Sequence, residues 1–310
     1  MTTKILKLET PAFEWPTWIL IIAVYGGWIG TTVYGAQMPW WLLLIVGGWF
    51  TGWYYSLQHE VIHGHPTKLT WLNDLIGYAP FGLFIPYPVY RADHTRHHNK
   101  DILTIPGLDP ESYYFDAITW AAMPGPLKVI HIINNALIGR LTVGVAITII
   151  RFWYGELRGL QRGDLSHLYA WALHIVLVAA VLYWVNIICG LPIWLYILTF
   201  AYPGLALTMM RSYTEHRAAA DPEHRTAVVE SHGLGSLFGL LFLNNNLHVA
   251  HHDRPAMPWY QLPSYYRRNR EAFLAENDGF LFHGYSDVVR RFLFAPIDAP
   301  ICRTIRQTRQ

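Results

Sequence analysis

The chain has 310 residues, of which 53% are hydrophobic, 15% aromatic and 14% charged. Soluble domains carry about 25% charged residues, so this composition indicates a membrane protein. The formal net charge of +2 argues against a nucleic-acid-binding protein, and the two cysteines form no CxxC pattern that would suggest a thiolate metal site.

A long stretch without charged residues lies near the start of the chain. Residues 15–58 contain no Asp, Glu, Lys or Arg, which is too long for one membrane span of ~20 residues and right for two. The segment Gly35-Ala36-Gln37-Met38-Pro39 interrupts this stretch and predicts helices over residues 15–34 and 39–58. Residues 1–14 lack an apolar run, so no cleavable signal sequence is expected there.

A second charge-free stretch, residues 165–210, has the same organisation. Its interruption at Cys189-Gly190-Leu191-Pro192 predicts helices over residues 167–188 and 192–211. The expected fold is therefore all-α and integral to the membrane, with four transmembrane helices in two hairpins. A buried hairpin in a soluble protein is the competing interpretation, but two charge-free stretches of this length argue against it.

The basic residues predict the orientation of these helices. Both tight turns lack Lys and Arg, so all 23 basic residues lie on the side of the termini and the central loop. Basic residues favour the cytoplasmic side, where we expect both termini and residues 59–164 and 212–310, as parts of one domain. Residues 69–90 predict a re-entrant or interfacial segment. Residues 129–151 predict a helix along the membrane surface, with a further span as the alternative.

Three histidine clusters lie in the parts expected outside the membrane. They are His59-Glu60-Val61-Ile62-His63-Gly64-His65, then Asp93-His94-Thr95-Arg96-His97-His98, and then His248-Val249-Ala250-His251-His252-Asp253. Histidines three or four residues apart lie on one face of a helix, and neutral imidazole is a common metal ligand. Eight such histidines are too many for one tetrahedral zinc and suit two metals with open positions.

Two other kinds of metal protein fit part of this pattern. The first cluster also satisfies HExxH, in which Glu60 would be the general base of an intramembrane zinc protease, but this leaves both HxxHH clusters unexplained. A non-catalytic metal transporter would place ligands across the membrane, whereas these histidines are expected on one side. A di-metal site remains the main prediction.

The order HxxxH, HxxHH, HxxHH on two hairpins resembles the integral-membrane fatty acid desaturase and hydroxylase superfamily. The segment Arg254-Pro255-Ala256-Met257-Pro258-Trp259-Tyr260-Gln261-Leu262-Pro263 resembles its bacterial branch. This resemblance implies a non-haem di-iron centre in a cytoplasmic cap at the bacterial inner membrane, with a ninth histidine between the last span and the third cluster. His216 is the best match for it, and His232 and His224 are alternatives. The implied iron ligands are His59, His63, His94, His97, His98, His216, His248, His251 and His252.

Polar residues beside these ligands are candidates for orienting them. Glu60, Asp93, Glu215 and Asp253 each adjoin a ligand histidine, and a carboxylate can accept the second ring N–H of a metal-bound imidazole. His65 is an additional histidine next to the first cluster. The resemblance further suggests Asn244 as an amide near one iron.

The resemblance implies an O2-dependent oxidoreductase, either a desaturase of an acyl chain or fatty-acid-like small molecule or, alternatively, a hydroxylase or carotenoid ketolase. The chain has no haem, flavin or iron–sulfur motif, so an external electron donor is needed, and a ferredoxin or b-type cytochrome is expected. The lipid-like substrate should enter from the membrane. Candidate residues along its path are Trp53, Tyr54, Leu57, Tyr202, Leu205 and Met209.

Overall fold

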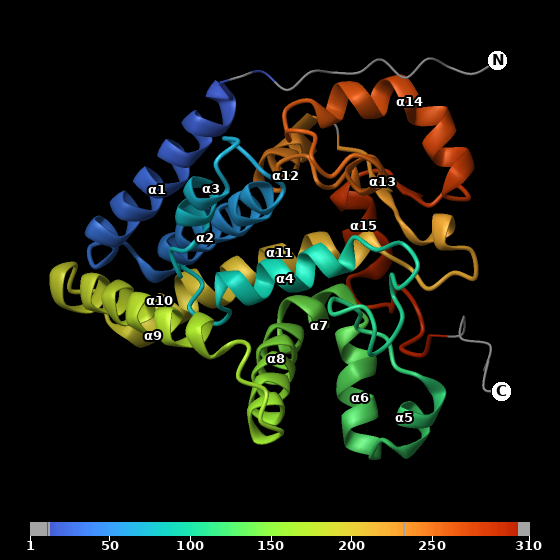
Figure 1. The fold of residues 1–310 in the computed structure, drawn as a ribbon, viewed down its shortest axis with the longest axis horizontal. Coiled ribbons are helices and arrows are strands. Elements are labelled where there is room, and N and C mark those ends of the chain that lie inside the picture. The colour runs from blue at the N-terminus through green and yellow to red at the C-terminus, as the bar shows by residue number, and fades with distance from the viewer. Residues whose placement is uncertain (1–10, 12, 232, 303–310) are drawn as a thin grey trace.

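The computed structural model describes residues 11, 13–231 and 233–302. Most of this part of the chain is helical (Figure 1). The helices of the first half are α1 (Trp15–Gly35), α2 (Trp40–Ile62), α3 (Thr70–Gly77), α4 (Tyr87–His97), α5 (Ala117–Ala122), α6 (Gly125–Asn134) and α7 (Leu137–Leu141). Those of the second half are α8 (Val143–Gln161), α9 (Leu168–Tyr183), α10 (Ile193–Tyr196), α11 (Tyr202–Glu215), α12 (Ser236–Leu241), α13 (His248–Asp253), α14 (Leu262–Glu276) and α15 (Tyr285–Phe292).

The four long helices lie where the two charge-free stretches predict them. α1 and α2 form the first hairpin, and α2 continues to Ile62, so His59 lies within the helix. In the second hairpin α9 extends through a π-helical turn to Ile188, and α10 joins α11 through another π-helical turn, giving one helix over Ile193–Glu215. Pro39 and Pro192, with their fixed φ angle, immediately precede the second helix of each hairpin.

Three helices of the described part are long and apolar enough to cross a membrane: Trp15–Gly35, Leu168–Ile188 and Ile193–Glu215. Their outer faces expose large apolar side chains such as Ile22, Ile175 and Trp194, as lipid-facing helices do. α2 has sufficient length, but its many Trp, Tyr and Gly residues make it less apolar. A fourth span therefore stays a prediction.

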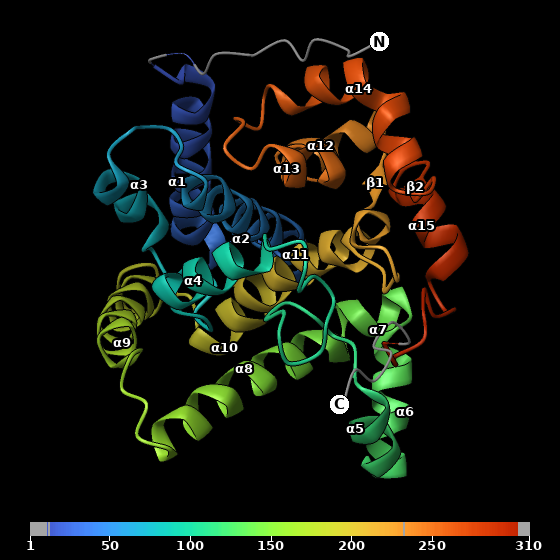
Figure 2. The same ribbon diagram turned by 45° about the vertical axis from the view of Figure 1, so that its right-hand side comes forward.

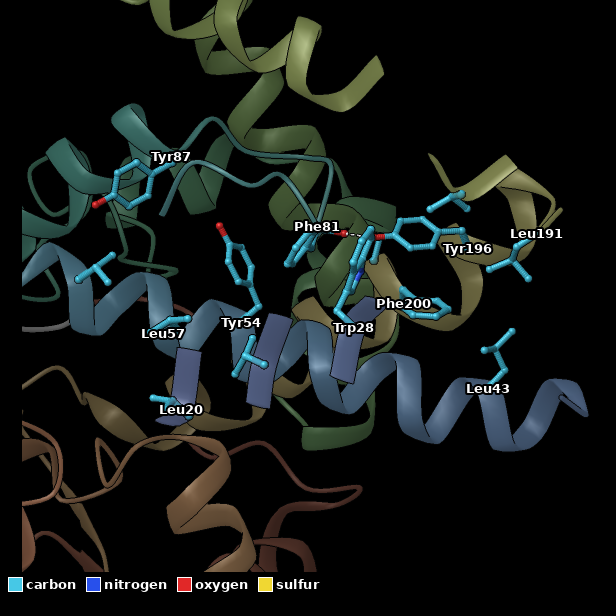
Figure 3. Packing of buried hydrophobic residues seen from close by; sticks show 14 of the residues in the cluster. Leu20, Trp28, Leu43, Tyr54, Leu57, Phe81, Tyr87, Leu191, Tyr196 and Phe200 are labelled. Atoms are coloured by element: carbon cyan, nitrogen blue, oxygen red, sulfur yellow. Dashed lines mark hydrogen bonds between the residues drawn. The ribbon is translucent and has the colours of Figure 1, made fainter. Parts of the chain in front are cut away.

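An aromatic core ties α1 to the second hairpin and to the segment between α3 and α4 (Figure 3). The Trp28 ring stacks on Phe81 with centroids 4.0 Å apart, and its Nε1–H donates to the Tyr196 hydroxyl at 3.0 Å. Tyr196 in turn donates to the Phe81 carbonyl at 2.7 Å. These hydrogen bonds satisfy polar atoms that burial would otherwise leave unpaired.

α2 and α11 cross at close range through small residues. A Cβ atom at Gly47 would lie 2.7 Å from the Thr199 carbonyl oxygen, and one at Gly204 would lie 2.6 Å from the Thr51 side chain. Small residues allow two helix backbones to approach closely. In both ribbon views α2 and α11 lie between α12–α14 on one side and α5–α8 on the other (Figure 2).

The predicted surface helix over residues 129–151 is divided into α6, α7 and α8. The division at Asn135 has a physical cause, because the Asn135 carbonyl accepts hydrogen bonds from the Tyr213 hydroxyl at 2.8 Å and from the Ile297 N–H at 3.0 Å. These tertiary hydrogen bonds replace the one that the Asn135 carbonyl would accept in a continuous helix. The fold also departs from purely α: β1 (Val228–Val229) and β2 (Leu281–Phe282) form a parallel pair.

Candidate metal centre

Nine histidines from four segments meet at one end of α2, α4 and α11. His59 and His63 come from the end of α2, His94, His97 and His98 from the end of α4, and His216 directly follows α11. α13 supplies His248, His251 and His252. They form two groups, each with its ligand atoms within 4.8 Å of one another. The first is His59, His63, His94, His98 and His251, and the second is His97, His216, His248 and His252.

The ring nitrogens have the spacing of ligands around a metal. The Nε2 atoms of His63 and His98 each lie 3.0 Å from that of His94. In the second group, Nε2 of His216 lies 3.0 Å from that of His97 and 2.9 Å from that of His248. Two nitrogens that bind one metal at ~2.1 Å with a right angle between them lie ~3.0 Å apart. The nine histidines therefore fit two metal ions.

Two carboxylates outside the histidine clusters hold the opposite ring nitrogens. Nδ1 of His94 lies 2.8 Å from Glu111 Oε1, and Nδ1 of His97 lies 2.9 Å from Asp109 Oδ1. An N–H bond from Nδ1 to a carboxylate leaves Nε2 free for a metal and fixes the ring orientation. Both residues lie in the loop after α4, well beyond the second cluster, so no motif in the sequence marks them as partners of these histidines.

An amide and an ion pair orient His248, one of the three histidines from α13. His248 Nδ1 donates to Asn245 Oδ1 at 3.0 Å and lies 3.3 Å from Glu215 Oε1. Glu215 is held in turn by Arg211 Nε at 2.9 Å. The Asn245 amide nitrogen also lies 3.3 Å from Nε2 of His59 in the other group, so this one side chain lies between both groups.

The amide at the centre is therefore Asn245, in place of the expected Asn244. Asn244 has a positive φ of 58°, and its side-chain N–H donates to the Trp259 carbonyl at 3.0 Å. The turn at residues 243–244, where Leu243 also has positive φ, directs the two neighbouring amides to different partners.

Three other residues that lie near ligand histidines in the sequence have partners outside the two histidine groups. Glu60 and His65 join Glu14 in a separate buried group, where His65 Nδ1 donates to Glu14 Oε1 at 2.8 Å and the Trp259 N–H donates to Glu60 Oε1 at 2.9 Å. Asp253 accepts a hydrogen bond from the Tyr265 hydroxyl. In a helix, adjacent side chains point about 100° apart, which separates Glu60 and Asp253 from the histidines that precede them.

The remaining candidates lie apart from both groups or outside the described residues. Asp93 lines a cavity beside the centre. His224 is 37% exposed, with its Nε2 3.9 Å from Asp221 Oδ2, and it belongs to neither group. His232 lies outside the described residues.

The charges around α4 favour cation binding. Burial, together with His94 and His97, lowers the pKa of His98 to about 3, so its ring is neutral at pH 7, as a metal ligand must be. Burial also acts to lower the pKa of His97, but Glu111 and Asp109 outweigh it and raise that pKa to about 9. A metal ion would replace the proton that these carboxylates attract.

A cavity of about 430 Å³ opens beside the second group and is lined by both His97 and His216. Of the substrate-path residues expected from the sequence, Leu205 and Met209 line it. Tyr54 and Leu57 belong instead to the aromatic core. A small molecule in this cavity would lie against the histidines.

The fold has long apolar helices, and its two histidine groups are able to hold metal ions. These features define the class of membrane proteins with a two-metal centre. The comparisons narrow this class: residues 35–285 match the family described as fatty acid desaturase, and the chain belongs to that family. The chain is also 24% identical over 276 residues to the sn-1 oleoyl-lipid 12-desaturase of Arthrospira platensis, covering 80% of this chain and 73% of that protein.

The asparagine pair allows a matched test of this centre. Replacing Asn245 by Ala removes the acceptor for His248 and the amide beside His59, so metal affinity should fall about tenfold. Asn244→Gly should leave metal affinity unchanged, because glycine adopts positive φ without strain and only the bond to Trp259 is lost. Chelator competition measures both; an equal loss in the two variants would contradict the assignment.

Proposed function

We propose that this chain is a membrane di-iron, O2-dependent desaturase that acts on an acyl chain or a fatty-acid-like small molecule. The observation that carries the proposal is the pair of histidine groups, which contain five and four residues. Within each group the ring nitrogens lie at distances suited to one metal ion. Family membership supports iron as the metal and an oxidoreductase as the activity. When bound, two irons would supply the oxidation of an unactivated C–H bond by O2.

The protein's own part in this chemistry is binding and orientation. His59, His63, His94, His98 and His251 would hold one iron, and His97, His216, His248 and His252 the other. Asp109 and Glu111 keep a proton on Nδ1 of their histidines, so that Nε2 faces the metal. The cavity beside His97 and His216 would hold the substrate against the centre and exclude bulk water.

We further propose that α1, α2, Leu168–Ile188 and Ile193–Glu215 cross the membrane, with both termini and the metal centre on the cytoplasmic side of a bacterial inner membrane. The absence of basic residues from the two hairpin turns supports this orientation. A ferredoxin or b-type cytochrome would supply electrons from the cytoplasm.

The position of Glu60 argues against the zinc protease alternative. A general base must lie next to the metal-bound water, yet Glu60 accepts from the Trp259 N–H and faces His65 in the separate group. The hydroxylase alternative uses the same histidines, so the product must distinguish it.

The test is metal analysis combined with product mass. Purified protein should contain two irons per chain, and with O2, a reductant and ferredoxin it should convert a fatty acyl substrate to a product lacking two hydrogens. A product that gains one oxygen atom would identify a hydroxylase instead. One zinc per chain, with no oxidised product, would contradict the proposal.

A further inference from the structure

The cavity beside the second histidine group contains a buried arginine with an unused donor. Arg140, in α7, is 3% exposed, and its Nε donates to the Asn134 carbonyl at 3.2 Å. Its Nη2 has no hydrogen-bond partner, and among the described residues no carboxylate lies within 4.0 Å of its guanidinium. A buried charge is costly unless it is paired, so this arginine is complementary to an anion from outside the chain.

A second arginine lines the same cavity at its more exposed side. Arg151, in α8, donates from Nη2 to the Ser112 carbonyl at 3.4 Å and likewise forms no ion pair within the described residues. Burial lowers the pKa of both arginines, and the positive charge of Arg140 contributes to the lowering at Arg151. Two positive charges in one cavity repel each other, and one bound anion would stabilise both.

Most other charged groups of the cavity are already engaged. Arg211 pairs with Glu215, and Glu111 and Asp109 hold histidines of the metal groups. Glu156 accepts from His167 and from the Trp171 N–H. Asp93 and Arg96 also line the cavity, and Arg96 is exposed to solvent. Arg140 is therefore the buried cation left for a ligand, and Arg151 is a further arginine of the cavity without an ion pair among the described residues.

Tyr113 joins Arg140 to the metal centre. The Arg140 guanidinium lies 4.0 Å from the Tyr113 ring centroid, and the Tyr113 hydroxyl donates to the His216 carbonyl at 3.3 Å. An anion bound to Arg140 would thus be separated from His216, a member of the second group, by about the length of the Tyr113 side chain. Carbons close to the anionic end of the ligand would lie nearest the histidines.

We infer that Arg140, assisted by Arg151, binds the free carboxylate of a single-chain acid inside this cavity, next to the metal centre. This inference rests on the proposed function in one respect: it takes the bound acid to be the substrate of the desaturase. A planar guanidinium matches a carboxylate with two parallel hydrogen bonds. The volume of about 430 Å³ suits a small molecule rather than a two-chain glycerolipid.

The test measures binding without turnover. Full-length protein in detergent, loaded with iron and given no electron donor, is titrated calorimetrically with octanoate, methyl octanoate and octyl phosphate. Wild-type protein should bind octanoate at least about tenfold more tightly than Arg140→Gln, and Arg151→Gln should weaken binding about threefold. Methyl octanoate should bind weakly and equally to wild type and Arg140→Gln.

Matched variants separate this site from folding and from the metal centre. Arg158→Gln removes an exposed arginine of the same helix as Arg151 that does not line the cavity, and its octanoate affinity should equal that of wild type. Arg140→Lys keeps the charge and should retain part of the affinity even if Arg140→Gln folds poorly. Iron content read on the same samples shows whether the metal centre is intact.

Three results would overturn the inference. These are unchanged octanoate affinity in a folded, iron-loaded Arg140→Gln protein, methyl octanoate binding as tightly as octanoate, or octyl phosphate binding more tightly than octanoate. Wild-type protein that holds no iron yet binds octanoate through Arg140 would refute the di-iron proposal while supporting the carboxylate site.

Discussion

His251→Ala and His252→Ala are each expected to bind about one iron per chain and to lose desaturation. The two residues are neighbours on α13 but belong to different groups, His251 to the first and His252 to the second. Each replacement therefore removes a ligand from one metal and leaves the other ligand set complete. Elemental analysis gives the iron content, and product analysis gives the activity.

The two variants also test whether there are two separate metals. His224→Ala is the control, since this partly exposed histidine belongs to neither group and its loss should change neither iron content nor activity. If either α13 variant keeps two irons, or if both lose all iron without any residual binding, the division into two groups is incorrect.

Asp109→Asn is expected to weaken iron binding by about 10–100-fold and to destabilise the protein by about 1–3 kcal/mol. The Asp109 side chain is buried, with Oδ1 2.9 Å from His97 Nδ1 and Oδ2 accepting from the Thr104 N–H at 2.8 Å. An amide can accept at only one of these two positions, so one buried donor loses its partner. Chelator competition and denaturant unfolding measure the two effects.

Asp93→Asn provides the matched control for this carboxylate. Asp93 adjoins His94 in the sequence, but Glu111 holds His94 and Asp109 holds His97. Iron affinity should therefore be unchanged in Asp93→Asn. A larger loss of iron affinity in Asp93→Asn than in Asp109→Asn would contradict the roles that the structure gives these two carboxylates.

The long helices were predictable because their cause is local. The absence of charge over residues 15–58 and 165–210, interrupted by Gly and Pro, is sufficient to locate α1, α2 and the helices that end at Ile188 and Glu215. The division of residues 129–151 was not predictable in this way. It depends on the Tyr213 hydroxyl and the Ile297 N–H, which reach Asn135 from distant parts of the chain.

The histidines of the centre could be named from the sequence, but most residues that orient them could not. Helical spacing alone groups His94 with His98, and His248 with His252. The partners of Nδ1 come from other segments: Glu111 and Asp109 from a loop, and Asn245 from a turn with positive φ. Adjacency in the sequence favoured Asp93 and Asp253, and the family resemblance suggested Asn244. None of these three described side chains forms a hydrogen bond with a histidine of the centre.

The spread of the nine histidines along the chain, from His59 to His252, has a consequence for biosynthesis. Both groups need residues from α13 as well as from α4, so neither is complete while the ribosome is still translating the second hairpin. Contacts between such distant residues form late, after the loops between them have closed. Iron insertion should therefore follow membrane insertion and the folding of the last third of the chain. A chain released before α13 would offer only incomplete metal sites.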